Sequence, residues 1–163
     1  MAATDFEDLV RRHQDRLYGF ALALTRAPQD AEDVVQEAFL RAQRALAGWE
    51  PSRRASLSEA AWLHRIALNV FRNRLRAERR RPTVPLEAVA EPAADGLDPS
   101  RTRELRDALA RLPRRYREAV VMRHVQGLDY AEMAAVAGAP EGTLKSDVHR
   151  GLKLLKEELS EWN

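Results

Sequence analysis

Apolar residues recur with the period of an amphipathic helix through three long segments in the first half of the chain. Pro28 separates the first segment from the second, and the third covers residues 59–80. We expect the second helix to run from Ala31 to Leu46 with Asp30 as its N-cap, because an Asp side chain accepts hydrogen bonds from the unpaired N–H groups there. The three apolar stripes consist of Phe6, Leu9, Val10, Leu17, Phe20, Ala21 and Leu24; of Val34, Val35, Ala38, Phe39 and Ala42; and of Ala61, Leu63, Ile66, Ala67, Val70, Phe71 and Leu75.

The second half of the chain begins with two shorter segments of helical period, over residues 103–112 and 116–125. Between the halves, residues 82–100 contain four prolines and follow neither a helical nor a strand period. We interpret this stretch as a flexible acidic linker. The sequence therefore predicts an all-α protein in which two small helical domains, residues 1–81 and 101–163, are joined by the linker.

The stretch from Asp129 to Leu155 has the layout of a helix-turn-helix. Gly138 is expected to end the first helix, because glycine adopts the left-handed conformation at little cost. Pro140 stands where the second helix starts, and a missing N–H costs least there. The apolar positions of the two helices are Met133, Ala134 and Ala137, followed by Leu144, Val148, Leu152 and Leu155.

Polar side chains occupy the other faces of this second helix, at Thr143, Lys145, Ser146, His149 and Arg150. In DNA-binding proteins of this layout, the second helix enters the major groove with its N-terminal residues against the base edges. These five residues are therefore candidate DNA contacts. The alternative is an ordinary helical hairpin whose basic face is solvated.

Charge is distributed unevenly, although the net charge of the whole chain is only +2. Residues 51–81 hold nine arginines against two glutamates, and concentrated basic charge is what a phosphate backbone attracts. Asn69 and Asn73 stand four residues apart among these arginines, at a small cost in helix propensity. Arginine contacts phosphates and asparagine pairs with base edges, so this helix is a second candidate for nucleic-acid binding. A solvated arginine-rich helix surface is the alternative.

An acidic cluster between Asp30 and Glu37 allows three interpretations. A metal site lacks support, because no histidine stands near and no EF-hand glycine pattern occurs. A solvated face stabilised by the helix dipole is the second interpretation. We favour the third, a docking face for a basic partner.

Several classes of protein are disfavoured by what the sequence lacks. There is no cysteine, no apolar stretch that approaches a membrane span, and no signal-peptide pattern, so we expect a soluble, cytoplasmic chain that does not insert into membranes. No nucleophile–base pair, phosphate-binding glycine loop or metal-ligand spacing occurs, so we expect neither an enzyme nor a cofactor. His13, His64 and His124 are isolated, and we interpret each as a satisfied surface or core histidine.

Three segments in series resemble bacterial sigma factors of the extracytoplasmic-function group. They are DAEDVVQEAFLRA at residues 30–42, AWLHRIALNVFRNRLRAERRR at residues 61–81 and LPRRYREAVVMRHVQGLDYAEMAAVAGAPEGTLKSDVHRGLKLLK at residues 112–156. The resemblance covers nearly the whole chain. It implies an initiation factor that binds core RNA polymerase and promoter DNA, has no catalytic activity of its own, and is held inactive by an anti-sigma factor.

The resemblance also implies a role for each group of candidate residues. Polymerase docking falls to Asp30, Asp33, Val34, Gln36, Glu37 and Phe39. Contacts to the minus-ten element fall to Arg53, Arg54, Asn69, Arg72, Asn73, Arg76 and Arg80. Contacts to the minus-thirty-five element fall to Thr143, Lys145, Ser146, His149 and Arg150. Family members often carry arginine where this chain has Asp147, which would either repel phosphate or accept a hydrogen bond from cytosine.

Two other functions remain open at this point. A helix-turn-helix regulator could own the same C-terminal domain without being a polymerase subunit, and a helical interaction protein could carry basic faces that are merely solvated. The helix with Asn69, Arg72 and Asn73 separates the first rival from a sigma factor, because a protein that binds only double-stranded DNA has no need of it.

Overall fold

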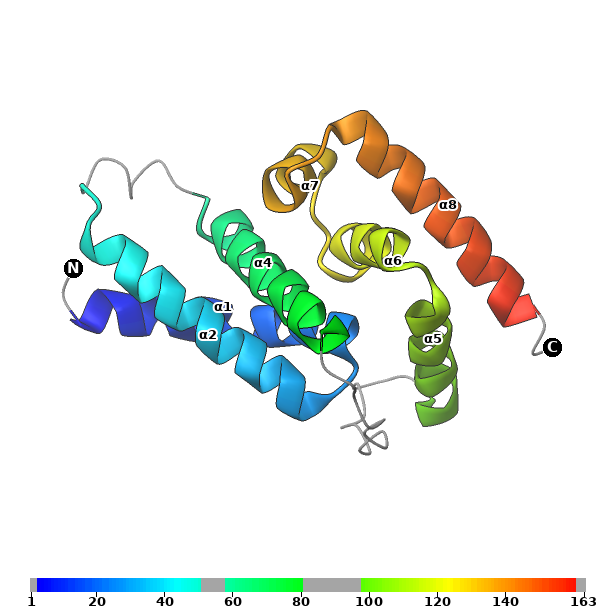
Figure 1. Cartoon of the computed structure of the whole chain (residues 1–163), viewed down its shortest axis with the longest axis horizontal. Helices are drawn as coiled ribbons and strands as arrows, with labels where there is room; N and C mark the ends of the chain where they lie inside the picture. The colour runs from blue at the N-terminus through cyan, green and yellow to red at the C-terminus, as the bar shows by residue number, and fades with distance from the viewer. Residues whose placement is uncertain (1–2, 51–57, 81–97, 161–163) are drawn as a thin grey trace.

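The computed structural model describes residues 3–50, 58–80 and 98–160, and all regular secondary structure in these ranges is helical (Figure 1). The predicted all-α fold is thereby confirmed. The elements are α1 (Ala3–Thr25), α2 (Pro28–Ala47), α4 (Glu59–Arg79), α5 (Pro99–Arg111), α6 (Arg114–Val120), the π-helix η1 (Val121–Val125), α7 (Tyr130–Ala137) and α8 (Glu141–Ser160).

Helices α2 and α5 begin earlier than expected, and proline is the reason in both. Helix α2 begins at Pro28 after the N-cap residue Ala27, so the prediction that Asp30 caps this helix is wrong. Helix α5 begins at Pro99, and the Asp98 carboxylate accepts a hydrogen bond from the Ser100 N–H at 3.1 Å. Proline at the first helical position has its φ angle already set and loses no hydrogen bond. Most of the predicted linker lies outside the described residues.

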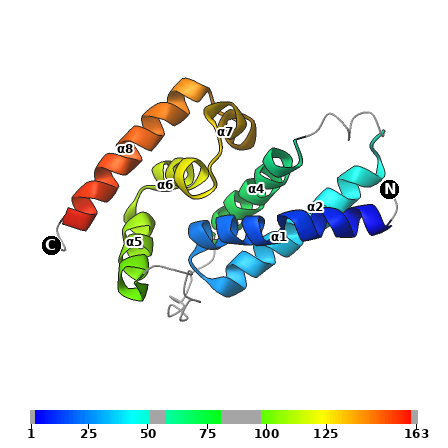
Figure 2. The same cartoon turned by 180° about the vertical axis from the view of Figure 1, so that it is seen from behind.

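The helices form two groups that pack against each other. Helices α1, α2 and α4 form the N-terminal domain, and α5 to α8 with η1 form the C-terminal domain (Figures 1 and 2). Helix α4 packs against α7, and α1 packs against η1. The sequence left open whether the two domains associate within one chain; in this structure they do.

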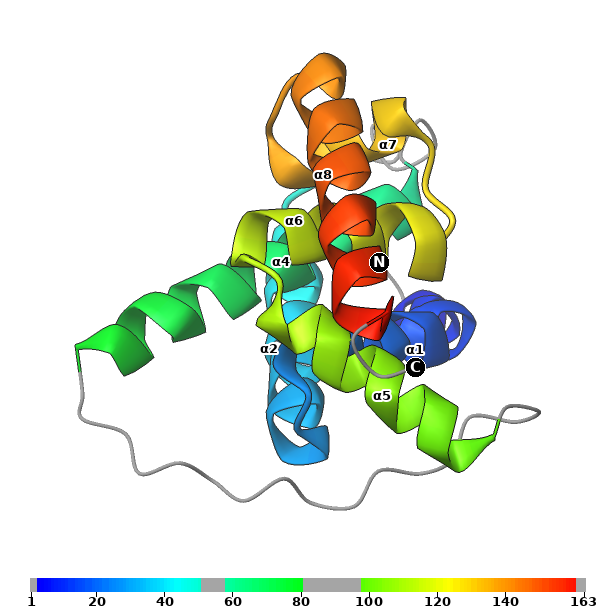
Figure 3. The same cartoon turned by 90° about the vertical axis from the view of Figure 1, so that its right-hand side faces the viewer.

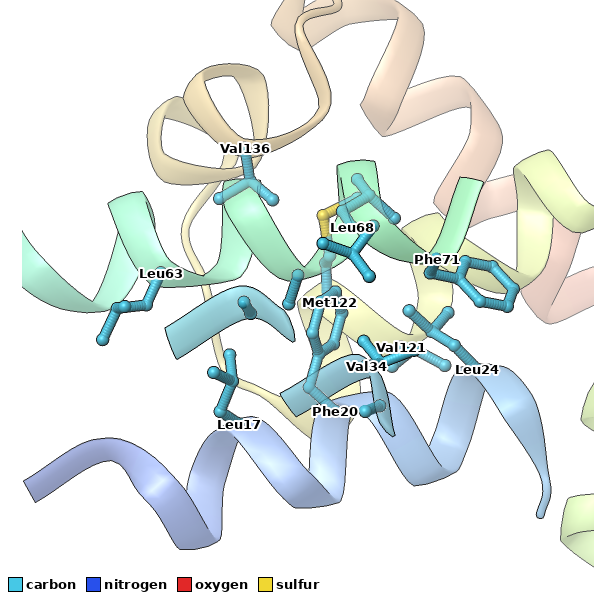
Figure 4. Packing of buried hydrophobic residues seen from close by; sticks show 14 of the residues in the cluster. Leu17, Phe20, Leu24, Val34, Leu63, Leu68, Phe71, Val121, Met122 and Val136 are labelled. Carbon is cyan, nitrogen blue, oxygen red and sulfur yellow. The ribbon is translucent and has the colours of Figure 1, made fainter. Parts of the chain in front are cut away.

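A single apolar core runs across this contact between the domains (Figure 4). Phe20 from α1 and Leu68 from α4 belong to the same cluster of buried residues as Met122 from η1 and Val136 from α7. Burying each large apolar side chain contributes roughly 1.5–3 kcal/mol to stability. A contact built from such residues therefore stabilises the closed arrangement of the two domains.

The apolar face of α8 differs from the predicted one at a single position. Leu144, Val148 and Leu155 are buried as expected, but Leu152 is 38% exposed and that prediction is wrong. Gly151 is buried in its place, because the backbone of α8 approaches α6 at this point. A Cβ atom at Gly151 would stand 2.6 Å from Val120 Cγ2 and 3.1 Å from the Tyr116 carbonyl oxygen.

The expected helix over residues 116–125 is present but changes its winding. It begins at Arg114 as α6 and continues as the π-helix η1, which ends where the Gln126 N–H donates to the Val121 carbonyl at 3.0 Å. A π-turn holds one more residue than an α-turn, so it alters which side chains face a neighbouring helix. Gln126 follows this turn and reaches the N-terminal domain, as described below.

Candidate nucleic-acid interface

The predicted helix-turn-helix is present, and local interactions define where its first helix begins and ends. Asp129 Oδ1 accepts from the Glu132 N–H and Glu132 Oε2 accepts from the Asp129 N–H, both at 2.8 Å, which forms a capping box at the start of α7. Gly138 ends α7 with a φ of 67°, as predicted, and Pro140 directly precedes α8. These elements place the N-terminal turns of α8 at the surface.

The exposed face of α8 carries the candidate residues for double-stranded DNA. Lys145, Ser146, His149 and Arg150 are exposed, and Thr143 is half-buried. The Lys145 ammonium nitrogen lies 5.4 Å from the centre of the Tyr130 ring. The structure therefore gathers four of the five candidates on one solvated face, where groove contacts are sterically possible.

A further cation stands beside this face and was not identified from the sequence. The Arg123 guanidinium carbon lies 4.9 Å from the centre of the Tyr130 ring, and Arg123 Nη1 donates to the Leu128 carbonyl at 2.9 Å. Tyr130 thus contacts two cations, Arg123 and Lys145, from its position on α7. No spacing signal links Arg123 to α8, because the two come together only through the fold.

Asp147 does not share the exposed face of α8. It is buried, and its Oδ2 atom accepts a hydrogen bond from Arg115 Nε at 2.8 Å. Its Oδ1 atom is buried and has no hydrogen-bond partner among the described residues. Two effects were expected for Asp147, repulsion of phosphate and a hydrogen bond from cytosine. Neither applies in this conformation, because the carboxylate is buried on the inner side of α8.

Helix α4 presents a second polar face, on the other domain. Asn69, Asn73, Arg76 and Arg80 are exposed, and Arg76 Nη1 donates to Asn73 Oδ1 at 3.4 Å. Figure 3 shows the C-terminal end of α4 projecting away from the other helices. Residues 53 and 54, the two arginines predicted in the preceding loop, lie outside the described residues.

Arg72 is separated from these neighbours although it lies on the same helix. Its side chain is only 24% exposed and points to the C-terminal domain. Arg72 Nη2 donates to Glu118 Oε2 at 2.9 Å, and Arg72 Nη1 donates to the Ala137 carbonyl at 3.3 Å. In this conformation Arg72 joins the two domains, so its predicted contact to DNA would require them to move apart.

Polar groups at the domain contact are paired across it. His64 Nε2 lies 2.7 Å from Gln126 Oε1, and Arg16 Nη2 donates to the Gln126 carbonyl at 2.6 Å. Arg26, at the end of α1, pairs with Asp107 on α5. His64 is 2% exposed and its Nδ1 atom lies 2.6 Å from the Ala60 carbonyl oxygen, which confirms the interpretation of His64 as a satisfied core histidine.

Burial lowers the pKa of His64, and the hydrogen bonds to Gln126 and Ala60 only partly oppose this effect. We expect the free energy of unfolding to fall as pH drops below about 6.5. The reason is that His64 binds a proton in the unfolded chain at this pH, whereas the buried imidazole of the folded chain stays neutral. The slope contributed by one such histidine reaches about 1.4 kcal/mol per pH unit. Denaturant titrations between pH 5 and pH 8 measure this slope.

The matched comparison for this prediction uses two variants. His64→Gln should lose the dependence on pH, whereas His124→Gln, at an exposed position, should retain it. If His64→Gln keeps the full slope, another group is responsible.

A groove of about 440 Å³ lies between α2 and α4. Asp33, Gln36 and Glu37 line it together with Leu40, whose exposed fraction of 47% is high for a leucine. Arg74 of α4 lies 3.3 Å from Asp30 Oδ1 and 3.6 Å from Asp33 Oδ2. Arg41 also lines the groove, and its Nε donates to Glu37 Oε1 at 2.8 Å, so the groove combines an apolar side chain with paired acidic and basic groups.

The predicted docking residues divide into two sets in the structure. Asp30, Asp33, Gln36 and Glu37 lie at the surface, at or beside the groove. Val34 and Phe39 are 1% and 8% exposed and belong to the core, so they do not line the predicted contact surface. The amphipathic period of α2 places Val34 and Phe39 on its buried side. Leu40 lies outside this apolar stripe, and an apolar residue on the polar side of a helix is the signal that could have identified it as a contact residue.

Within the described residues, no group of three histidine, aspartate or glutamate side chains is arranged to hold a metal ion. None of the helices in these same ranges is both long enough and apolar enough to cross a membrane.

Comparisons with known proteins agree with the division into two domains. The family model for sigma-70 region 2 matches residues 9–81, and that for sigma-70 region 4 matches residues 102–155. The chain is 36% identical to the ECF RNA polymerase sigma factor SigE of Mycolicibacterium smegmatis over 98% of its own length and 63% of that protein, so it spans less than two thirds of this relative. It is 38% identical to the RNA polymerase sigma factor CarQ of Myxococcus xanthus, covering 96% of this chain and 90% of CarQ.

Among solved structures, the sigma factor RpoE of Bartonella quintana, in complex with the anti-sigma factor NepR, has a similar fold. The TM-score is 0.82 at 29% identity, over 97% of this chain and 98% of that one. The shared fold therefore covers both domains rather than one.

Proposed function

Because the chain belongs to the extracytoplasmic-function sigma factors of RNA polymerase, we propose that residues 1–81 bind core polymerase and the minus-ten element, and that residues 101–163 bind the minus-thirty-five element. Residues 82–100 connect the two. The observation that carries the proposal is the presence of two separate polar faces, one on α4 and one on α8, on different domains of one chain.

The face on α8 suits the major groove of the minus-thirty-five element. Lys145, His149 and Arg150 reach the base edges and nearby phosphates from the exposed side of the helix. Thr143 and Ser146 bind phosphate at the helix N-terminus, where backbone N–H groups and the helix dipole already favour anions.

The face on α4 suits the separated strand of the minus-ten element. Asn69 and Asn73 pair with unstacked bases, while Arg76 and Arg80 contact phosphates. Arg53 and Arg54 belong to the loop that holds an extruded base, and Arg72 joins the set once the domains part. A regulator that binds only double-stranded DNA has no use for this second face, so the arrangement favours a sigma factor over that alternative.

The groove between α2 and α4 suits the polymerase. Asp33 and Glu37 pair with Arg74 and Arg41 in the free chain and would exchange these partners for a basic segment of the polymerase, while Leu40 offers that segment an apolar contact that contributes most of the affinity. An anti-sigma factor is the expected inhibitor, since RpoE, the structural relative described above, was solved bound to one. The chain acts in the cytoplasm, where polymerase and promoter DNA are found.

We expect the purified chain to bind core RNA polymerase and direct specific transcripts, and we expect Leu40→Asp to weaken polymerase binding by about 10-fold to 100-fold. The reason is that burial of a leucine is worth roughly 1.5–3 kcal/mol. Fluorescence titration of labelled chain with core polymerase measures the affinity, and run-off transcription reports the activity.

Gln14→Asp is the matched control, because it adds the same charge at an exposed position of α1 outside the groove. Equal losses in the two variants would show that charge alone is responsible. A wild-type chain that binds DNA but never polymerase would favour the regulator instead.

A further inference from the structure

A second cavity, of about 430 Å³, lies between the domains behind the helix-turn-helix. Among the residues that the structure describes, Arg72 is its one lining residue from the N-terminal domain, and the rest of its wall comes from α6, η1, α7, α8 and the turn between the last two. Two carboxylates line this cavity: the side chains of Glu118 and Asp147 are 5% and 4% exposed. We call it the arginine pocket, because it binds the guanidinium group of Arg72.

The Arg72 guanidinium fits this pocket as a ligand. Its Nη2 donates to Glu118 Oε2 at 2.9 Å and its Nε donates to Glu118 Oε1 at 3.4 Å, so both carboxylate oxygens are engaged. Its Nη1 donates to the carbonyl of Ala137 at 3.3 Å. Ala137 is the last residue of α7, where carbonyls lack partners within the helix and the helix dipole is negative.

Burial explains why the two carboxylates of the pocket require cationic partners, and Arg114 and Arg115 line the pocket together with Arg72. A buried carboxylate that loses its partner is strongly destabilising. Without Arg72, Glu118 would keep the contact with Arg114 Nη1 at 3.4 Å, which is the longer of its two ion pairs. Asp147 pairs through Oδ2 with Arg115, and its buried Oδ1 atom has no partner among the described residues. The carboxylate oxygens of the pocket can therefore accept more hydrogen bonds than the described donors of the C-terminal domain supply.

We propose that the arginine pocket is a binding site of the C-terminal domain for a guanidinium group, and that its occupant, Arg72, is withdrawn there from nucleic acid. The second half of this proposal rests on the proposed role of α4 in strand binding. The N–H groups that Arg72 gives to Glu118 cannot also be given to a phosphate. Occupation of the pocket and strand binding by Arg72 therefore exclude each other, and DNA competes with Glu118 for one side chain.

The test uses the full-length chain and Glu118→Gln, which keeps the shape of the side chain but removes its charge. We expect this variant to bind a fluorescently labelled 20-nucleotide oligothymidylate about fivefold to tenfold more tightly in low salt, measured by anisotropy. Asp107→Asn is the matched control. It breaks a different interdomain ion pair, with Arg26, but releases no arginine on α4, so its affinity should stay within about twofold of wild type.

Two further measurements make the result decisive. The double variant Arg72→Ala/Glu118→Gln should lose the gain, which excludes Arg114 as its source. Because the chain has no cysteine, dyes on Gln43→Cys and Lys156→Cys report the separation of the domains by energy transfer, which should fall in Glu118→Gln. Circular dichroism melting confirms that each variant is folded.

The possible outcomes divide clearly. A gain in Asp107→Asn equal to that in Glu118→Gln, or a gain that survives Arg72→Ala, overturns the competition. Unchanged energy transfer in Glu118→Gln overturns the pocket as an interdomain binding site. If energy transfer falls but no variant binds the oligonucleotide, the pocket stands and the proposed strand binding by α4 fails.

Discussion

Reversing two charges on the exposed face of α8, with Lys145→Glu and Arg150→Glu together, is expected to lower promoter-dependent transcription by at least about 100-fold. Each specific contact between a cationic side chain and DNA is worth roughly 1–3 kcal/mol, and each added carboxylate also repels phosphate. Neither side chain contributes to the core, since both are exposed, so the fold should survive. Run-off transcription with reconstituted holoenzyme measures the loss.

Lys156→Glu is the control for this pair, because Lys156 is also exposed but lies nearly two turns beyond Arg150 on α8. We expect a loss of no more than a few-fold from this change, through the general field of the domain. Should the double reversal leave transcription intact while the chain still binds polymerase, the assignment of α8 to the minus-thirty-five element is refuted.

Replacing Gly151 by alanine is expected to destabilise the chain by roughly 1–3 kcal/mol, the cost of forcing added volume into a packed site. This is opposite in sign to the usual effect of glycine-to-alanine changes inside helices, which stabilise by up to about 1 kcal/mol. The new Cβ atom would stand 2.6 Å from Val120 Cγ2, and the Tyr116 backbone at 3.1 Å limits how far α8 can move. Thermal unfolding should show a melting temperature lower by about 3–10 °C.

Gly142→Ala provides the opposite outcome within the same helix. Apart from its chain neighbours and the local helix backbone, a Cβ atom at Gly142 meets no described atom within 4 Å, so we expect this substitution to be neutral or stabilising. Equal melting temperatures for the two variants would show that α6 and α8 are not packed as closely as the structure indicates.

Features that depend on residues close together along the chain were predictable from the sequence. The left-handed Gly138, the position of Pro140 and the extent of α4 follow from local conformational preferences and helical periodicity. The polar set on α8 was also predictable, because one helix face that is apolar leaves the opposite face to solvent. These features determined the fold class and the family to which the chain belongs.

Features that depend on which helix covers which face were decided only by the tertiary structure. Periodicity places a side chain around the axis of its own helix but does not identify the neighbouring helix. Arg72 and Asp147 were therefore expected at DNA, yet each is held by a partner from a distant part of the chain, Glu118 and Arg115. Gly151 drew no attention in the sequence because its importance lies in the close approach of α6. The two faces that we propose for nucleic acid were predictable from the sequence alone, whereas the closed contact that holds Arg72 away from one of them arises from packing between the domains.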